Sequence, residues 1–183
     1  MRSAILGLAA LGLLVTGCSG DPEPPAPDPT AVAPVEPAWN PCSSLDADAV
    51  IARLGATYSV RRGTAQEPVC TFVPDNDGDP VVDINYNTFT GSLPELLATF
   101  GVDGTGSTKV RIPEIPGAKD ARVLATRGDD DTLRITGFVR NGLLVQVVNV
   151  LDPAPFDEKD VLRDVTSLMA DLAAGAKASG LTG

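Results

Sequence analysis

The sequence predicts an α+β fold, with a mainly antiparallel sheet flanked by helices on both faces as an α/β sandwich. Three segments place apolar residues at helical spacing, and several others alternate apolar and polar residues as strands do. Asn141-Gly142 joins the two clearest strand segments, and this dipeptide is the strongest short signal for a hairpin. Both faces of that hairpin carry apolar residues, and such a sheet is normally covered on both sides.

The first half of the folded region is expected to hold two helices. The first runs from Ser44, a candidate N-cap, to Gly55, a typical helix stop. The second follows Ser92, another candidate N-cap, and ends at Gly101. The strands expected in this half cover residues 58–62, 69–73 and 81–87.

The second half is expected to hold a run of strands and one long helix. The helix begins at Asp157 and ends near Gly175, with apolar residues recurring at i, i+3, i+4 and i+7. The expected strands cover residues 110–112, 121–126, 132–140 and 143–151.

The expected hairpin turn also sets the pairing of the two strands that it joins. Asn141 and Gly142 are taken as its two central residues. The resulting pairs are Val139 with Leu144, Ile135 with Val148, Leu133 with Val150, Phe138 with Val145 and Thr136 with Val147.

Residues 1–17 are predicted to be a secretory signal, because Arg2 precedes an unbroken apolar run over residues 4–15. That run of about 12 residues is shorter than the ~20 that a membrane span needs. Val15-Thr16-Gly17-Cys18 resembles the bacterial lipobox, which is aliphatic, small, small, Cys. The resemblance implies cleavage before Cys18 and acylation of that residue. The alternative is an ordinary secretory signal that holds a cysteine by chance.

Residues 18–38 are expected to be the lipidated Cys18 followed by a Pro-rich tether, because prolines alternate there with Ala, Asp and Glu. The alternative is a proline-rich recognition ligand. One globular domain is expected over residues 39–178, followed by a frayed tail over 179–183.

Composition excludes several classes of function. The net charge of −10 argues against a nucleic-acid partner. The chain has no histidine, which removes nucleophile–His catalysis and most zinc sites. With Cys18 acylated, Cys42 and Cys70 remain, and an exported protein most simply joins them in one disulfide. The alternative is a pair of free thiols that binds a metal or acts in redox chemistry.

Two motifs suggest a family. Asn40-Pro41-Cys42-Ser43-Ser44-Leu45 follows the tether, and Val69-Cys70-Thr71-Phe72 comes later. This layout resembles the actinobacterial lipoproteins called domain of unknown function 3558, whose domain opens with N-P-C-x-x-L. In that family an aromatic residue, often Trp, follows the second cysteine, whereas here Phe72 stands two residues on. The resemblance covers about residues 39–176. It implies a secreted, lipid-anchored domain with a Cys42–Cys70 disulfide, and it implies no activity.

Three other motifs give weaker indications of ligand binding. The acidic loop over residues 75–79 lacks the later Gly and Glu of a calcium-binding EF-hand, so a solvated turn is expected, with weak calcium binding as the alternative. The glycines over 101–106 are expected to form a loop, since no phosphate-loop Lys-Ser/Thr follows. Four arginines are expected to be solvated or paired with carboxylates, namely Arg122, Arg127, Arg134 and Arg140. The alternative is that they bind an anionic group.

Taken together, the sequence predicts a lipid-anchored protein on the extracytoplasmic face of the cell membrane. It is expected to be a non-enzymatic binding module for a small molecule or an envelope protein, without catalytic residues, metal or cofactor. Two places are expected to bind: a groove between a helix and the sheet, and the loop rim near residues 101–117. The alternatives are a carboxylate-based hydrolase and an accessory docking subunit of an envelope complex.

Overall fold

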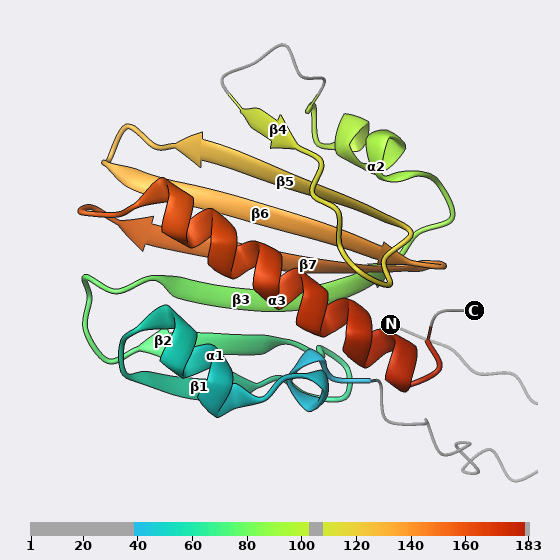
Figure 1. Cartoon of the computed structure of the whole chain (residues 1–183), viewed down its shortest axis with the longest axis horizontal. Helices are drawn as coiled ribbons and strands as arrows, with labels where there is room; N and C mark the ends of the chain where they lie inside the picture. The colour runs from blue at the N-terminus through green and yellow to red at the C-terminus, as the bar shows by residue number, and fades with distance from the viewer. Residues whose placement is uncertain (1–38, 103–107, 182–183) are drawn as a thin grey trace, which may run out of the picture. The chain divides into compact units, whose positions relative to one another are not determined.

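The computed structural model describes residues 39–102 and 108–181, which form an α+β fold as predicted (Figure 1). The described residues contain one seven-stranded sheet with strand order β1-β2-β3-β7-β6-β5-β4. Every neighbouring pair of strands is antiparallel. The elements are η1 (Pro41–Ser44), α1 (Ala47–Leu54), β1 (Tyr58–Arg62), β2 (Cys70–Pro74), β3 (Val81–Thr88), α2 (Leu93–Thr99), β4 (Lys109–Arg111), β5 (Asp120–Arg127), β6 (Thr132–Asn141), β7 (Leu144–Pro153) and α3 (Glu158–Ala178).

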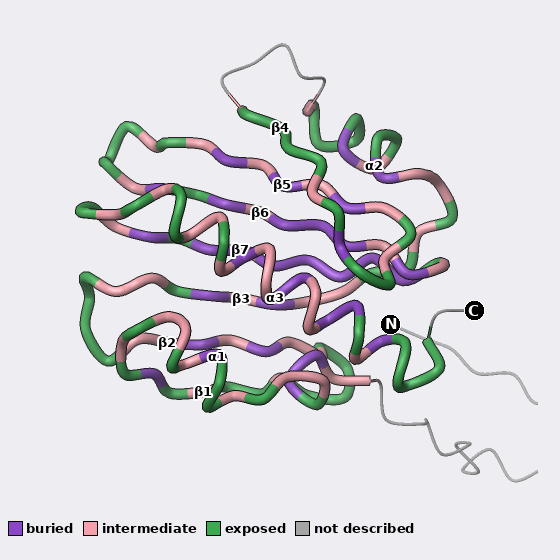
Figure 2. Tube along the Cα trace, viewed as in Figure 1, coloured by how far each residue is buried: buried purple, intermediate pink, exposed green. Residues whose placement is uncertain are grey.

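The long helix α3 crosses one face of the sheet, which we call the inner face (Figure 1). Its apolar stripe is buried there, as the purple segments of Figure 2 show. The helix comes close to the centre of β6 because Gly137 has no side chain. A Cβ at Gly137 would lie 2.6 Å from the Met169 sulfur and 3.0 Å from Val165 Cγ1. The core on this face also includes Val50 of α1 and Phe72 of β2.

A second apolar cluster lies apart from this core. Leu93 and Leu97 of α2 are buried against Phe138, Val145 and Val147 of β6 and β7. Because side chains alternate along a strand, Phe138 points to the opposite side of the sheet from Ile135 and Val139, which belong to the inner core. The apolar residues that the sequence shows on both faces of the hairpin are therefore buried in two separate clusters.

The pairing predicted for β6 and β7 is wrong by two residues. In the structure Asn141 pairs with Leu144, and Ile135 pairs with Val150. The turn is formed by Gly142 and Leu143, with Gly142 at a φ of +62°. The reason is that Asn141 is buried in the strand, where its amide donates to the Gly117 carbonyl oxygen at 2.9 Å. A shift of two keeps each side chain on its predicted face, so the inner and outer residues are unchanged.

Two predicted helix ends also differ. Ser44 is not the cap of α1, because it belongs to the 3₁₀ turn η1; the Asp46 carboxylate accepts from the Ala49 N–H instead. Gly175 does not end α3, which continues to Ala178. Gly175 instead allows the helix to approach η1, since a Cβ there would lie 2.2 Å from Ser44 Cβ. The predicted cap Ser92 is confirmed, since its side chain accepts from the Glu95 N–H. Asp157, which was predicted to be the first residue of α3, is instead its cap and accepts from the Lys159 and Asp160 N–H groups.

The predicted disulfide is confirmed, and it ties η1 to β2. Cys42 and Cys70 are bonded and both are buried. Among the described helices, none combines the length and the apolar character that a membrane crossing requires.

Replacing both half-cystines by serine tests the role of this bond. Loss of a cross-link between residues separated by 28 positions is expected to lower the free energy of unfolding by about 3 kcal/mol, measured by urea denaturation. Reduction of the native chain should produce the same shift. Equal urea midpoints for oxidised and reduced protein would contradict the assignment.

Candidate functional site

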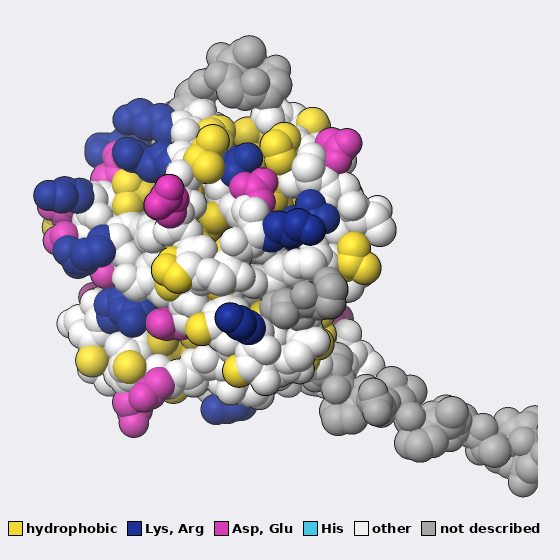
Figure 3. All heavy atoms as spheres, turned by 45° about the vertical axis from the view of Figure 1, so that its right-hand side comes forward, with side chains coloured by type: hydrophobic (Ala, Val, Ile, Leu, Met, Phe, Trp, Pro, Cys, Tyr) yellow, Lys and Arg dark blue, Asp and Glu magenta, His cyan; other side chains and the backbone are white. Residues whose placement is uncertain are grey.

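Positive charge is unevenly distributed over this acidic protein. The chain carries 14 Lys and Arg against 24 Asp and Glu, a net charge of −10. Figure 3 nevertheless shows several Lys and Arg side chains gathered at the upper left. Hydrophobic side chains are exposed beside them at the top of the same view. Basic and apolar side chains also meet in the space between β4 and α3.

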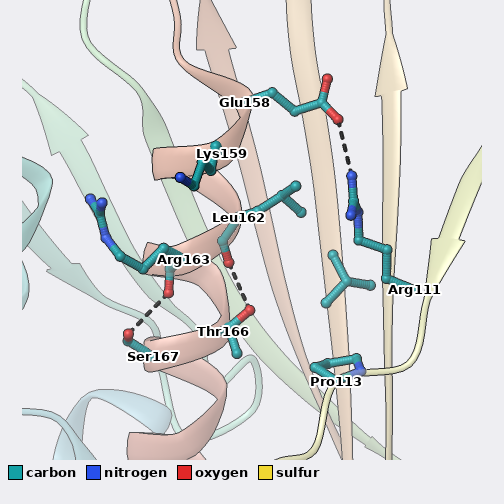
Figure 4. A pocket seen from close by; sticks show the side chains of 9 residues that line it. Arg111, Pro113, Glu158, Lys159, Leu162, Arg163, Thr166 and Ser167 are labelled. Atoms are coloured by element: carbon teal, nitrogen blue, oxygen red, sulfur yellow. Dashed lines mark hydrogen bonds and ion pairs between the residues drawn. The ribbon is translucent and has the colours of Figure 1, made fainter.

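A groove of about 540 Å³ lies there, and we call it the α3 groove (Figure 4). Val123 of β5, Leu162 of α3 and Pro113 after β4 supply its apolar lining. Val123 is buried, and Leu162 and Pro113 are half-buried. The Thr166 hydroxyl also lines the groove and donates to the Leu162 carbonyl oxygen at 2.7 Å, which leaves its oxygen able to accept a bond.

Three cations surround one carboxylate at the end of this groove. Glu158, the first residue of α3, pairs with Arg111 at 3.5 Å and with Arg127 at 3.1 Å. Lys109 lines a small adjoining pocket together with Arg127 and Glu158. The Glu158 side chain is 18% exposed, whereas Arg111 and Arg127 are 53% and 65% exposed. The hydrogen bond from Arg127 and the nearby positive charges lower the pKa of Glu158.

The charges along the rest of α3 are arranged differently. In Figure 4 the side chains of Arg111 and Glu158 point toward each other, whereas Lys159 and Arg163 extend from the other side of the helix. Arg163 is paired with Asp160 at 2.5 Å and with Asp164 at 3.2 Å. Arg163 is thus balanced by two carboxylates, whereas Arg111 and Arg127 share the single carboxylate of Glu158. Positive charge is therefore in excess at the Arg111 end, and Lys159 adds a further cation to the lining.

Five aspartates line a second, smaller pocket of about 250 Å³ at the start of α3, namely Asp79, Asp152, Asp157, Asp160 and Asp164. Asp152 is buried, and burial together with the charge of Asp79 raises its pKa. Burial, Asp79 and Asp152 likewise raise the pKa of Tyr58. Within residues 39–102 and 108–181, no group of three or more acidic or cysteine side chains is arranged to hold a metal ion.

The residues singled out from the sequence are placed as follows. Cys42 and Cys70 form the disulfide, and Cys18 lies outside the described residues. The acidic loop over 75–79 forms a turn in which the Asn76 amide donates to the Asp79 carboxylate. Residues 103–107 of the predicted glycine loop and binding rim lie outside the described residues, but Arg111 and Pro113 from that rim line the α3 groove.

The four arginines considered as an anion site have separate partners. Arg122 bonds to the carboxylate of Asp120, Arg127 to Glu158 and Arg134 to Asp130, and Arg140 donates to the Gly142 carbonyl oxygen. The expectation that they are paired is thus confirmed for three of them. The cluster that does form, Lys109, Arg111 and Arg127, was missed because the sequence gives no sign that β4 lies beside the start of α3.

No protein-family model matches the chain, and no curated protein is similar to it. The resemblance to the actinobacterial lipoproteins therefore stays a prediction.

Substituting Glu158 by Gln tests the electrostatics of the α3 groove. Because the folded state lowers the pKa of Glu158 below its unfolded value of about 4.3, its stabilising contribution is complete above that pH and is lost as the pH falls through the folded-state pKa. The variant is expected to have a free energy of unfolding about 0.5 to 1 kcal/mol below that of the native chain at neutral pH, and this difference should be smaller at about pH 3. The measurement is urea denaturation at both pH values.

Glu67, an exposed glutamate of the β1–β2 loop, supplies the matched control. Glu67→Gln should leave stability unchanged at both pH values. A Glu158→Gln effect that is the same at neutral and acidic pH would show that the pairing with Arg111 and Arg127 contributes nothing.

Proposed function

We propose that this chain is a lipid-anchored binding module on the extracytoplasmic face of the cell membrane, and that the α3 groove holds an anionic amphiphile. The observation that carries the proposal is the pairing of an apolar lining with excess positive charge in a chain of net charge −10. The secretory signal and the lipobox-like residues 15–18 support the location. The proposal also takes α1 and α3 to cover one face of the sheet and α2 to cover part of the other, which the two separate apolar clusters support.

The proposed ligand has two parts. Its apolar body lies against Val123, Leu162 and Pro113, where burial of apolar surface is favourable. Its carboxylate or phosphate meets the guanidinium groups of Arg111 and Arg127. Each guanidinium has five N–H donors, and both side chains are more than half exposed, so donors remain beyond those used by Glu158. A volume of about 540 Å³ suits a small-molecule ligand.

Binding without catalysis is the function that this groove supports best. Glu158 is the only carboxylate among the described residues of its lining, and its lowered pKa keeps it ionised at neutral pH. An ionised carboxylate held by two arginines is a poor proton donor and a weak base. The groove therefore offers no acid–base pair.

The second candidate function is a carboxylate-based hydrolase. Its active site would be the pocket of about 250 Å³ that five aspartates line. The pKa of Asp152 is raised, which is the direction that favours a general acid, and Asp79 and Asp160 line the same pocket. If the chain is such a hydrolase, Asp152→Asn should abolish its hydrolytic activity.

A sulfonate dye tests the α3 groove, and its uncharged analogue serves as the control. Anilinonaphthalene sulfonate has an aromatic body and one anionic group, and its uncharged analogue N-phenylnaphthylamine lacks the sulfonate. Arg111→Ala is expected to weaken sulfonate binding about tenfold, because it removes a charge-assisted hydrogen bond. Binding of the uncharged dye should not change. Fluorescence titration measures both affinities.

Arg134 is a closely matched control. Its guanidinium, like that of Arg111, pairs with one carboxylate at 3.5 Å, and its side chain is 56% exposed compared with 53%. Arg134→Ala should leave binding of the sulfonate dye unchanged. Equal affinity in the two variants would exclude the α3 groove as the anion site.

The proposed anchor is tested by Cys18→Ala. The variant should carry no acyl chains and should leave the membrane fraction, since two acyl chains supply the attachment. Mass spectrometry and membrane fractionation of the expressed chain measure the two effects. Retention of the variant in the membrane fraction would contradict anchoring through Cys18.

A further inference from the structure

A second groove, of about 610 Å³, lies on the face of the sheet opposite α3, and we call it the outer groove. Phe138 and Val147, which point away from the inner core, belong to its lining together with Leu124. Phe89 precedes α2 and Phe100 follows it, and both side chains complete the apolar part. The groove therefore lies where α2 meets the sheet without covering it fully.

Aromatic side chains are concentrated in this groove. The chain has five phenylalanines, and three of them line it. The Phe100 and Phe138 rings are stacked, with centroids 6.3 Å apart. Phe100 is 63% exposed, although it is one of the largest apolar side chains in the protein. An aromatic ring held in this way offers a flat apolar surface to a ligand ring.

The position of α2 is well fixed, so these rings have a rigid support. Leu93 and Leu97 are buried beneath the helix. A capping box also closes its first turn, in which the Ser92 N–H donates to the Glu95 carboxylate at 2.6 Å. Preorganisation of this kind lowers the entropy lost when a ligand binds.

The other wall of the groove is made of uncharged polar side chains. Asn85 and Asn87 come from β3, Thr136 from β6 and Asn149 from β7. The Thr136 hydroxyl donates to Asn149 Oδ1 at 3.2 Å, so the Asn149 NH₂ group is left to donate to a ligand. The Asn85 NH₂ group donates to the Asp83 carboxylate at 3.2 Å, so Asn85 Oδ1 is left to accept.

The described residues that line the outer groove carry no charge. An ionised group placed against this lining would lose hydration without gaining a partner. The lining thus disfavours the anionic ligand that suits the α3 groove. It favours a molecule with apolar rings and a few hydrogen-bonding groups, and the volume is within the usual range for such ligands.

We propose that the outer groove is a second ligand site, which binds an uncharged, mainly apolar small molecule with hydrogen-bonding groups along one edge. The ring system stacks beside Phe100 over Val147, and the polar edge meets the amides of Asn85 and Asn149. This site is independent of the α3 groove, because the two share no lining residue.

Titration of the full chain with N-phenylnaphthylamine tests the proposal. This dye is uncharged and has two aromatic groups and one N–H donor. Phe100→Ala is expected to weaken its binding about tenfold, since the variant removes a stacking ring and apolar contact area. Because Phe100 is largely exposed, the variant should keep the urea midpoint of the native chain. Binding of the sulfonate dye should be unaffected by this change.

Ile112→Ala is the matched control, because Ile112 is also a large exposed apolar side chain, 69% exposed, and lies outside the outer groove. Native affinity for the uncharged dye in this variant, with weakened affinity in Phe100→Ala, is the expected pattern. Absence of dye binding to the native chain, unchanged binding in Phe100→Ala, or equal losses in both variants would overturn the proposal. None of these outcomes bears on the sulfonate dye, so failure here leaves the α3 groove to be judged separately.

Discussion

The close approach of α3 to β6 at Gly137 is the contact on which the rest of the structure depends. A side chain at that position would collide with Met169 and Val165, so the missing Cβ lets the helix lie directly on the central strands. The far end of α3 has a second close contact, where Gly175 faces Ser44 of η1. Since η1 also holds Cys42, the disulfide to Cys70 extends this attachment to β2. One helix thereby links the centre of the sheet to its β1–β2 side.

The two grooves lie at parts of the sheet that α3 does not cover. The helix α3 packs on β6 and β7, and the adjoining edge of β4 and β5 is left beside it rather than beneath it. The α3 groove opens there, with basic side chains from the edge strands facing Glu158. Around Phe138, whose side chain points away from the inner core, part of the apolar surface of the sheet lines the outer groove. One groove is cationic and the other uncharged, so they are suited to different ligands.

Local patterns predicted the elements well, and long-range contacts account for what was missed. Helical spacing on α3, alternation on β6 and β7, and the cap Ser92 follow from short-range preferences, and each is found in the structure. The hairpin pairing failed because Asn141, an ordinary turn residue, is held in the strand by the distant Gly117 carbonyl oxygen. A glycine after a helical pattern predicts a helix end, but Gly175 is instead a contact point with Ser44, which is remote in the sequence.

The candidate sites were harder to predict because they too are formed by residues that are distant in the sequence. Arg111 and Glu158 become partners only through the packing of α3 beside β4. The asparagines of β3 fit a solvated strand face in the alternation pattern, and nothing local shows that Phe89 and Phe100 stand across from them. The five phenylalanines are scattered through the sequence, whereas the fold brings three of them together in one groove.

The central claim is that these uncovered parts of the sheet are occupied by small molecules. Native mass spectrometry of the full chain, after incubation with a lipid extract of cell envelopes, tests it most directly. We predict a discrete mass added to that of the acylated, disulfide-bonded chain. Detection of the acylated chain alone would contradict the claim, and would identify both grooves as gaps in helix packing without a ligand.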